Sequence, residues 1–169
     1  MTISMYQASV PVFIRMLSNL KIVLEKAASH AQAKKIEQSV LLNTRLYPDM
    51  FPLTRQVHIA TDFARSTGAR LAGLETPVFE DNEKTIAELT ARANRTVEFP
   101  RTLKASPIDG SGSRVILRPV RGEPKKLTGI NYLLQFALPN FYFHVTAPYA
   151  ILRHCGVELG KSDFIGALD

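Results

Sequence analysis

Apolar residues recur along the first part of the chain at spacings that alternate between four and three. The stripe consists of Tyr6, Val10, Phe13, Leu17, Leu20, Leu24, Ala27 and Ala31. Such spacing places the apolar side chains on one face of a helix, so it predicts a long amphipathic α-helix. Pro11 lies inside the pattern, and we therefore expect the helix to be kinked there or to begin after Ser4.

A second helix is predicted over residues 50–72. Its apolar stripe consists of Leu53, Val57, Ala60, Ala64 and Leu71. Asp49 is a suitable N-cap, because its carboxylate can accept hydrogen bonds from the first free backbone N–H groups. Gly73 is expected to end this helix, because glycine readily adopts the left-handed conformation of a C-terminal cap.

A third helix is predicted over residues 82–97, with Ile86, Leu89 and Ala93 on its apolar face. Asp81 is the expected N-cap. The carboxylates of Asp81 and Glu83 then lie at the helix start, where negative charge is favourable beside the helix dipole. The pattern thus gives these two acids a local role in stabilising the helix.

Residues 100–127 interrupt the helical pattern with four prolines and the turn-rich run Asp-Gly-Ser-Gly-Ser. The stretch 115–117 is a short β-like run, and residues 121–124 are suited to a turn. We therefore expect a small β-hairpin or an ordered loop inserted between the third and fourth helices.

The last helical region is predicted from Thr128, as N-cap, to Cys155, with Gly156 ending it and Pro139 dividing it. Its inward stripe is predicted to contain Leu134, Ala137, Phe141, His144, Pro148, Ile151 and Cys155. Long helices with one apolar stripe each bury these stripes by packing around a shared core. The sequence therefore predicts a mainly all-α protein, with residues 1–169 forming one helical-bundle domain.

Composition changes this picture little. The 169 residues suit one domain, and no apolar run approaches the roughly 18 residues that a membrane-spanning helix needs. The N-terminus lacks a signal-peptide pattern and Cys155 is the only cysteine, which together favour a cytoplasmic protein without disulfides. The net charge is +6, but the basic residues are spread along the chain, so nucleic-acid binding is not expected.

His144 is the most informative polar residue, because it lies on the apolar stripe between Phe141 and Pro148. Asn140 lies one turn earlier on the same face. Two inward polar groups at this spacing can hold a metal or an ordered water. The alternative, which spacing alone favours, is a buried histidine that is hydrogen-bonded to a neighbour such as Tyr142 or Tyr149.

His58 lies at the edge of the second helix's stripe, with Asp62 one turn later. This pair is half of a suitable site for a divalent cation. It is also a common arrangement for a solvent-exposed pair, and this second interpretation is the one that the spacing favours.

The final helix is rich in aromatic residues: Phe136, Phe141, Tyr142, Phe143 and Tyr149. Such residues can line a ligand pocket or a dimer interface, although core packing accounts for at least half of them. We interpret Asn140, Tyr142 and Tyr149 as candidate ligand-binding residues. A homodimer and a small-molecule ligand are accordingly the predicted partners, with no membrane partner.

Five segments carry a resemblance to a known family: residues 45–50, 69–73, 138–146, 149–154 and 156–161. They resemble a family of bacterial and fungal proteins of unknown function within the DinB/YfiT-like superfamily of metalloenzymes. The resemblance implies an up-down-down-up four-helix bundle that is often dimeric. It also implies a zinc or nickel ion held by three histidines, one from the second helix and two from the last, and in some members thiol-transferase activity.

The match of the metal ligands is incomplete. His144 corresponds to the second histidine of the last helix, whereas the first falls at Asn140. The helix-two ligand would be His58 or Asp62, and Pro148 would distort the helix beside the site. The sequence therefore predicts a small-ligand-binding or dimeric bundle with a degenerate metal site. The alternative is a divalent-metal-dependent hydrolase or thiol transferase that uses His144.

Overall fold

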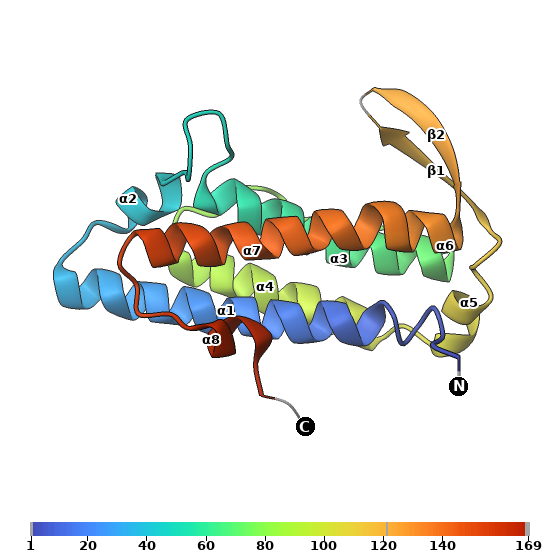
Figure 1. Cartoon of the computed structure of the whole chain (residues 1–169), viewed down its shortest axis with the longest axis horizontal. Coiled ribbons are helices and arrows are strands. Elements are labelled where there is room, and N and C mark those ends of the chain that lie inside the picture. Colours follow the sequence, from blue (N-terminus) through green and yellow to red (C-terminus); the bar gives the residue numbers. More distant parts are fainter. Residues whose placement is uncertain (1, 121, 168–169) are drawn as a thin grey trace.

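Four long helices lie side by side and form most of the computed structural model, which describes residues 2–120 and 122–167 (Figure 1). The long helices are α1 (Val10–Lys34), α3 (Leu53–Ala72), α4 (Ile86–Arg101) and α7 (Leu138–His154). The shorter elements are α2 (Gln38–Asn43), α5 (Ala105–Asp109), β1 (Val115–Val120), β2 (Glu123–Thr128), α6 (Gly129–Asn131), the π-helix η1 (Tyr132–Ala137) and α8 (Lys161–Ile165).

The direction of the long helices gives the topology. α1 and α7 run one way along the bundle, whereas α3 and α4 run the other way (Figure 1). α1 packs along α4 and α3 packs along α7, while the parallel pairs α3–α4 and α1–α7 complete the ring. The predicted mainly helical, up-down-down-up four-helix bundle is therefore confirmed.

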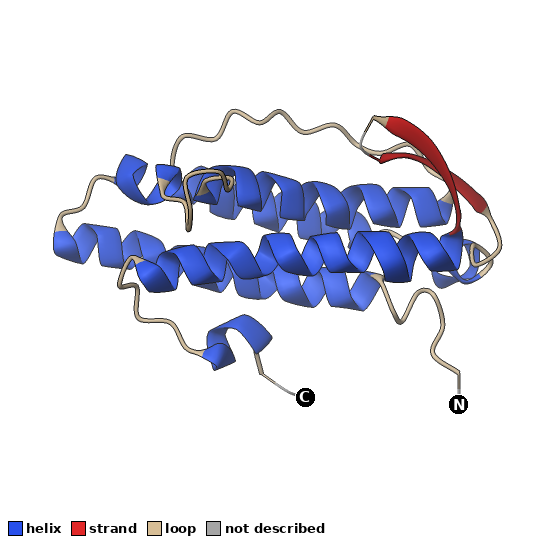
Figure 2. Ribbon diagram, turned by 45° about the horizontal axis from the view of Figure 1, so that its top comes forward, coloured by secondary structure: helices blue, strands red, loops and turns tan. Residues whose placement is uncertain are grey.

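A two-stranded antiparallel sheet lies at one end of the bundle (Figure 2). Its register pairs Val115 with Thr128 and Val120 with Glu123. Gly122 adopts a positive φ of 84° between the strands, as tight hairpin turns require. Ile116 is buried, so one face of the hairpin packs against the helices. This confirms the predicted hairpin between the third and fourth long helices, which follows the short helix α5.

The core fills the space between the long helices. The stripe predicted for the first helix is buried from Val10 to Ala31, whereas Tyr6 precedes the helix and is only partly buried. Pro11 occupies the first turn of α1, where its missing N–H leaves no hydrogen bond unmade. The helix therefore begins late rather than kinking. Across the core, the rings of Phe13 and Phe141 meet edge to face at 4.9 Å.

Two predicted helix starts are wrong. α3 begins at Leu53, after Pro52, and Asp49 does not cap it. α4 begins at Ile86 rather than at residue 82, and its N-cap is Thr85, which forms a reciprocal capping box with Glu88. Asp81 does not cap α4, because it lies four residues before the cap. α4 also continues through Pro100 to Arg101, beyond the predicted end.

The last helical region is continuous but not regular. Thr128 accepts a hydrogen bond from the backbone N–H of Asn131, and Gly156, with a φ of 85°, follows the last turn, so both predicted ends are confirmed. Ahead of Pro139, η1 is π-helical and fits more residues into each turn. This wider turn buries Tyr132 and leaves Leu134 49% exposed, so the inward position predicted for Leu134 is wrong.

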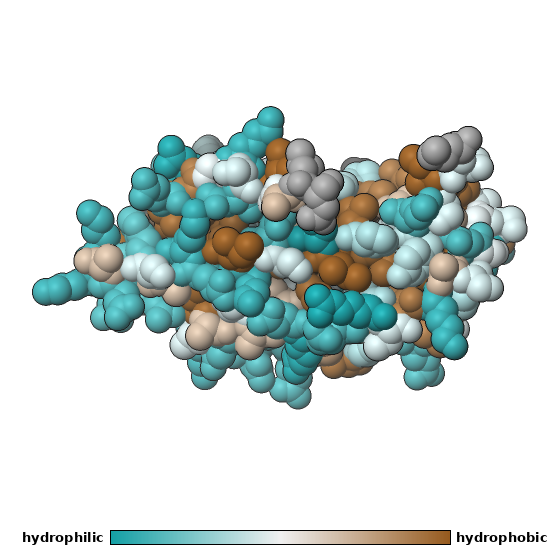
Figure 3. Space-filling view, turned by 90° about the horizontal axis from the view of Figure 1, so that it is seen from below, coloured by the Kyte–Doolittle hydropathy of each residue, from teal (hydrophilic) through white to brown (hydrophobic). Residues whose placement is uncertain are grey.

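Hydrophilic side chains cover most of one end of the molecule in the view from below, whereas hydrophobic ones gather over the middle (Figure 3). Among the described residues, no helix combines the length and the hydropathy that crossing a membrane would require.

Candidate functional site

A buried arginine joins α3, α4 and the segment between them. Arg92 on α4 is 1% exposed. Its Nη2 atom lies 3.0 Å from Oδ1 of Asp62 and 2.9 Å from Oδ1 of Asp81. Its Nη1 atom lies 3.1 Å from Oε1 of Glu83, and its Nε donates to the hydroxyl of Thr61 at 2.8 Å. Three carboxylates thus surround one desolvated cation, which is why the charge can be buried.

The structure therefore corrects the role predicted for Asp81 and Glu83. Both residues precede α4 and use their carboxylates to attach the 73–85 segment to Arg92 rather than to stabilise the helix start. Arg92 also donates to the backbone carbonyl of Glu80 at 2.8 Å. The guanidinium of Arg92 thus holds the segment against the bundle through both side-chain and backbone contacts.

His58 lies beside this cluster and is 4% exposed. Its Nε2 atom is 2.9 Å from Oε2 of Glu83, although the ring N–H does not point at this oxygen, so the pair is close but not an aligned hydrogen bond. Its Nδ1 atom is 3.7 Å from Oδ1 of Asp81. Burial, and secondarily the charge of Arg92, lowers the pKa of His58, while Asp81 and Glu83 partly oppose this shift. We therefore expect a neutral imidazole at pH 7.

His58 and Asp62 are therefore not the solvent-exposed pair that the spacing favours. Asp62 is bound to Arg92 and also accepts a hydrogen bond from Arg65 at 2.6 Å. Arg65 in turn lies over the ring of Phe79, 4.1 Å from its centroid. The two residues lie one turn apart on α3, but each is held by a different partner.

A cleft of about 510 Å³ opens beside His58, between α2, the start of α3 and the 73–85 segment. Most of the residues that line it are of polar types: Ser39, Leu42, Asn43, Pro52, Thr54, Arg55, His58, Asp81, Glu83 and Lys84. Arg55 is ion-paired with Asp81. The cleft thus has the size of a small-molecule site, and charged side chains of both signs lie in its wall.

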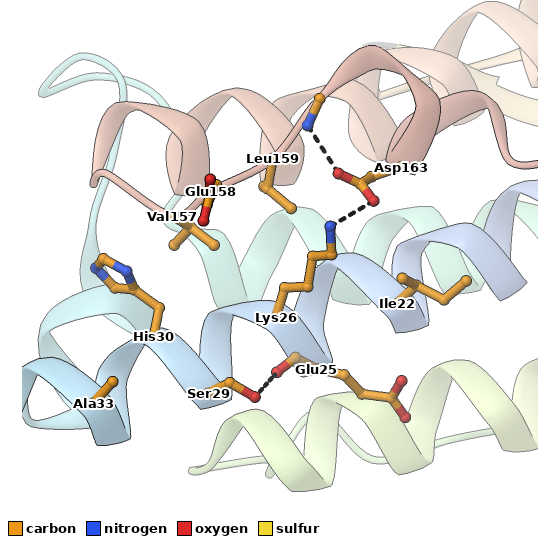
Figure 4. Close-up of a pocket in the computed structure, with 11 residues that line it drawn as sticks. Ile22, Glu25, Lys26, Ser29, His30, Ala33, Val157, Glu158, Leu159 and Asp163 are labelled. Carbon is orange, nitrogen blue, oxygen red and sulfur yellow. Dashed lines mark hydrogen bonds and ion pairs between the residues drawn. The ribbon is translucent and has the colours of Figure 1, made fainter.

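A larger cleft, of about 840 Å³, lies between α1 and residues 157–163 (Figure 4). Lys26 crosses it to Asp163 at 2.7 Å, and the same carboxylate accepts from the backbone N–H of Gly160 at 2.8 Å (Figure 4). His30, which also lines it, is only partly buried. Its volume is greater, but its side chains mainly attach the C-terminal segment to α1, so we place the candidate site at His58.

His144 on α7 is buried, 8% exposed, as its position on the apolar stripe predicted. Its Nδ1 atom lies 2.7 Å from Oε1 of Gln56, so Nδ1–H donates to this amide oxygen. The ring stacks on Phe63, with a centroid distance of 6.2 Å and an interplanar angle of 14°. Burial, reinforced by the charge of Arg55, lowers the pKa of His144 to about 4.

The three candidate ligand-binding residues of α7 do not converge on one cavity. Asn140 donates to the backbone carbonyl of Phe136 at 2.7 Å, within its own helix. Tyr142 is exposed, whereas Tyr149 packs against Phe164 with ring centroids 5.8 Å apart. None of the three is among the residues that line the His58 cleft.

The residues present do not fit a metal centre with three protein ligands. His144 alone is oriented as a metal-binding histidine would be, with Nδ1–H fixed by a carbonyl oxygen. Asn140 uses its amide within the helix, and Asp62 is held by two arginines. Within residues 2–120 and 122–167, no three His, Cys, Asp or Glu side chains are grouped as ligands.

Sequence reasoning missed Arg92 and Glu83 as site residues. A signal for Arg92 was available, because it follows Leu89 by three residues on the apolar side of α4. A cation in such a position has to find buried carboxylates. No comparable signal marks Glu83, since its contacts depend on how a segment without helix or strand folds back over α3.

The up-down-down-up bundle has the fold of a DinB-like helical protein. The chain belongs to the family described as Domain of unknown function (DUF1993), whose model matches residues 5–165. It is also similar to the crystal structure of a DinB family member protein from Shewanella denitrificans, with a TM-score of 0.90 and 41% identity. That match covers 96% of this chain and 92% of the other. No curated protein matches the chain.

Proposed function

We propose that this DinB-like protein binds a small polar molecule in the cleft beside His58. One observation carries the proposal: a buried imidazole lines an open cleft, and its Nε2 atom lies 2.9 Å from the carboxylate of Glu83, which Arg92 holds in place. Polar groups that are held in place before a ligand arrives lose little conformational entropy when it binds. The cleft is thus preorganised for a ligand.

The chemistry of the wall supports a polar rather than an apolar ligand. His58 offers a neutral ring nitrogen, because burial and Arg92 lower its pKa. Thr54, Asn43 and Ser39 add hydroxyl and amide groups to the same cleft. A cleft of this size with a few fixed polar groups suits recognition by hydrogen bonds.

A divalent-metal-dependent hydrolase or thiol transferase that uses His144 has less support. The orientation of His144 by Gln56 is the single feature that favours it. The ring stacks on Phe63, and its centroid is 5.1 Å from that of Phe143, so its neighbours are aromatic rings rather than further metal-binding side chains. The proposed function therefore does not involve zinc or nickel.

Ligand-observed NMR tests the proposal. Saturation-transfer spectra recorded with a set of free amino acids, small organic acids and small amines should identify binders, and these should shift the imidazole resonances of His58. His58→Asn should abolish these signals, whereas His154→Asn, an exposed histidine of the same type, should leave them unchanged. Saturation-transfer signals that persist in His58→Asn, or the absence of any binder at millimolar concentration, would contradict the proposal.

The homodimer predicted from the sequence is retained as a second proposal. Two adjacent aromatic residues of α7, Tyr142 and Phe143, are exposed, and aromatic side chains are enriched at protein interfaces. Light scattering at micromolar concentration should give twice the mass of 18.8 kDa for the wild type. Phe143→Ser should shift the protein towards monomer; a wild-type monomer would refute the dimer without affecting the ligand site.

A further inference from the structure

Asp81 is shared between two arginines in different surroundings. Arg92, whose side chain is fully buried, holds Oδ1 of Asp81 at 2.9 Å. Arg55, whose side chain is 45% exposed, pairs with the other oxygen, Oδ2. The Arg92 contact has one fully buried partner, whose charge needs its carboxylates, whereas both side chains of the Arg55 pair are more than a third exposed and water competes for them.

This difference gives Arg55 freedom to change partner. If Arg55 turns to another anion, Asp81 keeps the contact with Arg92 and is not left unpaired. The opposite exchange is costly, because Arg92 cannot leave its carboxylates without exposing buried charge. A ligand's anionic group can thus replace Asp81 as the partner of Arg55, while Asp81 stays bound to Arg92.

Lys84 adds a second cation to the same wall of the cleft. Its backbone N–H donates to Glu88 at 2.6 Å, which fixes the main chain, while the residue is exposed and lines the cleft. Both acids of the wall, Asp81 and Glu83, are already bound to Arg92. The cations that remain available to a ligand are therefore Arg55 and Lys84, and the cleft attracts negative charge.

We propose that Arg55 and Lys84 form an anion subsite that takes the carboxylate or phosphate group of the cleft's ligand, with Arg55 exchanging Asp81 for that group. The inference rests on the proposed function and names the class of its ligand: a small anion. The planar guanidinium of Arg55 provides paired donors for two oxygens, and Lys84 provides a point charge. His58 then contacts the part of the ligand beyond the anionic group.

Titrations with three probes test the subsite: sodium acetate, inorganic phosphate, and methylammonium chloride as a cation of similar size. The full chain is titrated at constant ionic strength while backbone, arginine side-chain and imidazole NMR signals are followed. Acetate or phosphate should shift the signals of Arg55, Lys84 and His58 with saturation, and methylammonium should not. Saturation with acetate alone identifies a carboxylate ligand, and tighter saturation with phosphate identifies a phosphate ligand.

Substitution separates a subsite from general attraction to a basic protein. Arg55→Gln and Lys84→Gln should each weaken anion binding by about tenfold, the loss expected for one charge-assisted hydrogen bond. Lys125→Gln removes the same charge from the exposed hairpin and should leave binding unchanged. Circular dichroism confirms that each variant is folded.

The outcomes distinguish this inference from the proposed function. Equal weakening by Lys125→Gln and Arg55→Gln would overturn the subsite, because binding would then follow net charge alone. Binding of neutral or cationic molecules at His58 that ignores Arg55→Gln would overturn the subsite and leave the ligand cleft standing. Absence of any binder, anionic or otherwise, would overturn both.

Discussion

The two buried histidines of the bundle lie in contrasting surroundings. His58 on α3 lies among ions, with Glu83 and Asp81 beside its ring and Arg92 behind them. His144 on α7 lies among aromatic rings and makes one neutral hydrogen bond, to Gln56. Burial lowers the pKa of both histidines, yet only His58 has carboxylates that oppose the shift.

The contrast shows that burial of a histidine does not by itself indicate a site. Gln56 of a neighbouring helix binds Nδ1 of His144, and the ring stacks on Phe63, which is the arrangement of a core residue. His58 lines a cleft and is connected to charged side chains that a ligand can reach. Perturbed titratable groups are informative about function when they also face a cavity.

Removing the centre of the ionic region should have the largest effect. Arg92→Met leaves Asp62, Asp81 and Glu83 without their shared cation, so we expect the free energy of unfolding to fall by about 3–5 kcal/mol. Urea unfolding at pH 7 measures this loss. Arg101→Met removes an exposed pair with Glu98 and should change stability little; equal losses in both variants would show that the Arg92 cluster contributes no special stability.

Acid should have the next largest effect, because protonation of His144 among its aromatic neighbours lowers the free energy of unfolding. The pKa of His144 is about 4 in the folded protein and near 6.5 in the unfolded chain, so the unfolded chain binds the proton first. Stability is therefore complete above pH 6.5 and falls between pH 6.5 and about 4, by about 3 kcal/mol. Urea unfolding at a series of pH values measures the slope.

His144→Gln should remove most of this pH dependence, because glutamine can donate to Gln56 but does not titrate. Some dependence should remain, since the pKa of His58 is also lowered. His154→Gln, at the exposed end of α7, is the matched control and should keep the wild-type slope. A His144→Gln variant with an unchanged slope would show that this ring does not resist protonation.

Metal addition should have the smallest effect. Protein purified without a His-tag should contain less than about a tenth of an equivalent of zinc or nickel, because the part of the chain that the structure describes assembles no three ligands at His144. Added zinc or nickel should leave the melting temperature unchanged, since only a ligand that binds the folded state raises it. Stoichiometric metal that is lost in His144→Ala would reverse our assignment of the two histidines.

The fold was largely predictable because each long helix has its own apolar stripe. Spacing on one helix located the buried face of α1, and it placed His144 inward. It misplaced Leu134, because a π-helical turn holds more residues than an α-helical one, so the α-helical spacing that fits α7 does not extend back into η1. Gly73 and Gly156 correctly marked the ends of α3 and of the last helix. Both adopt a positive φ, which glycine adopts more readily than other residues.

The site was less predictable, because it depends on contacts between distant segments. Asp81 and Glu83 have the composition of a helix start, and a capping role satisfied every local rule. In the structure α4 begins only after Thr85, and Arg92, nine residues after Glu83, binds both carboxylates instead. His58 likewise lies at the edge of the apolar stripe when α3 is considered alone. It becomes buried because the 73–85 segment packs against it through Asp81 and Glu83.

The π-helical turn of η1 has a consequence for how the chain tolerates changes in length. A π turn holds one residue more than an α-helical turn without rotating the helix that follows. Deleting Gln135 from η1 should therefore restore ordinary α-helical geometry while α7 keeps its orientation. A deletion of the same size within α7 would turn every later side chain by about 100° about the helix axis. In η1, therefore, the chain can lose one residue without changing how α7 packs in the bundle.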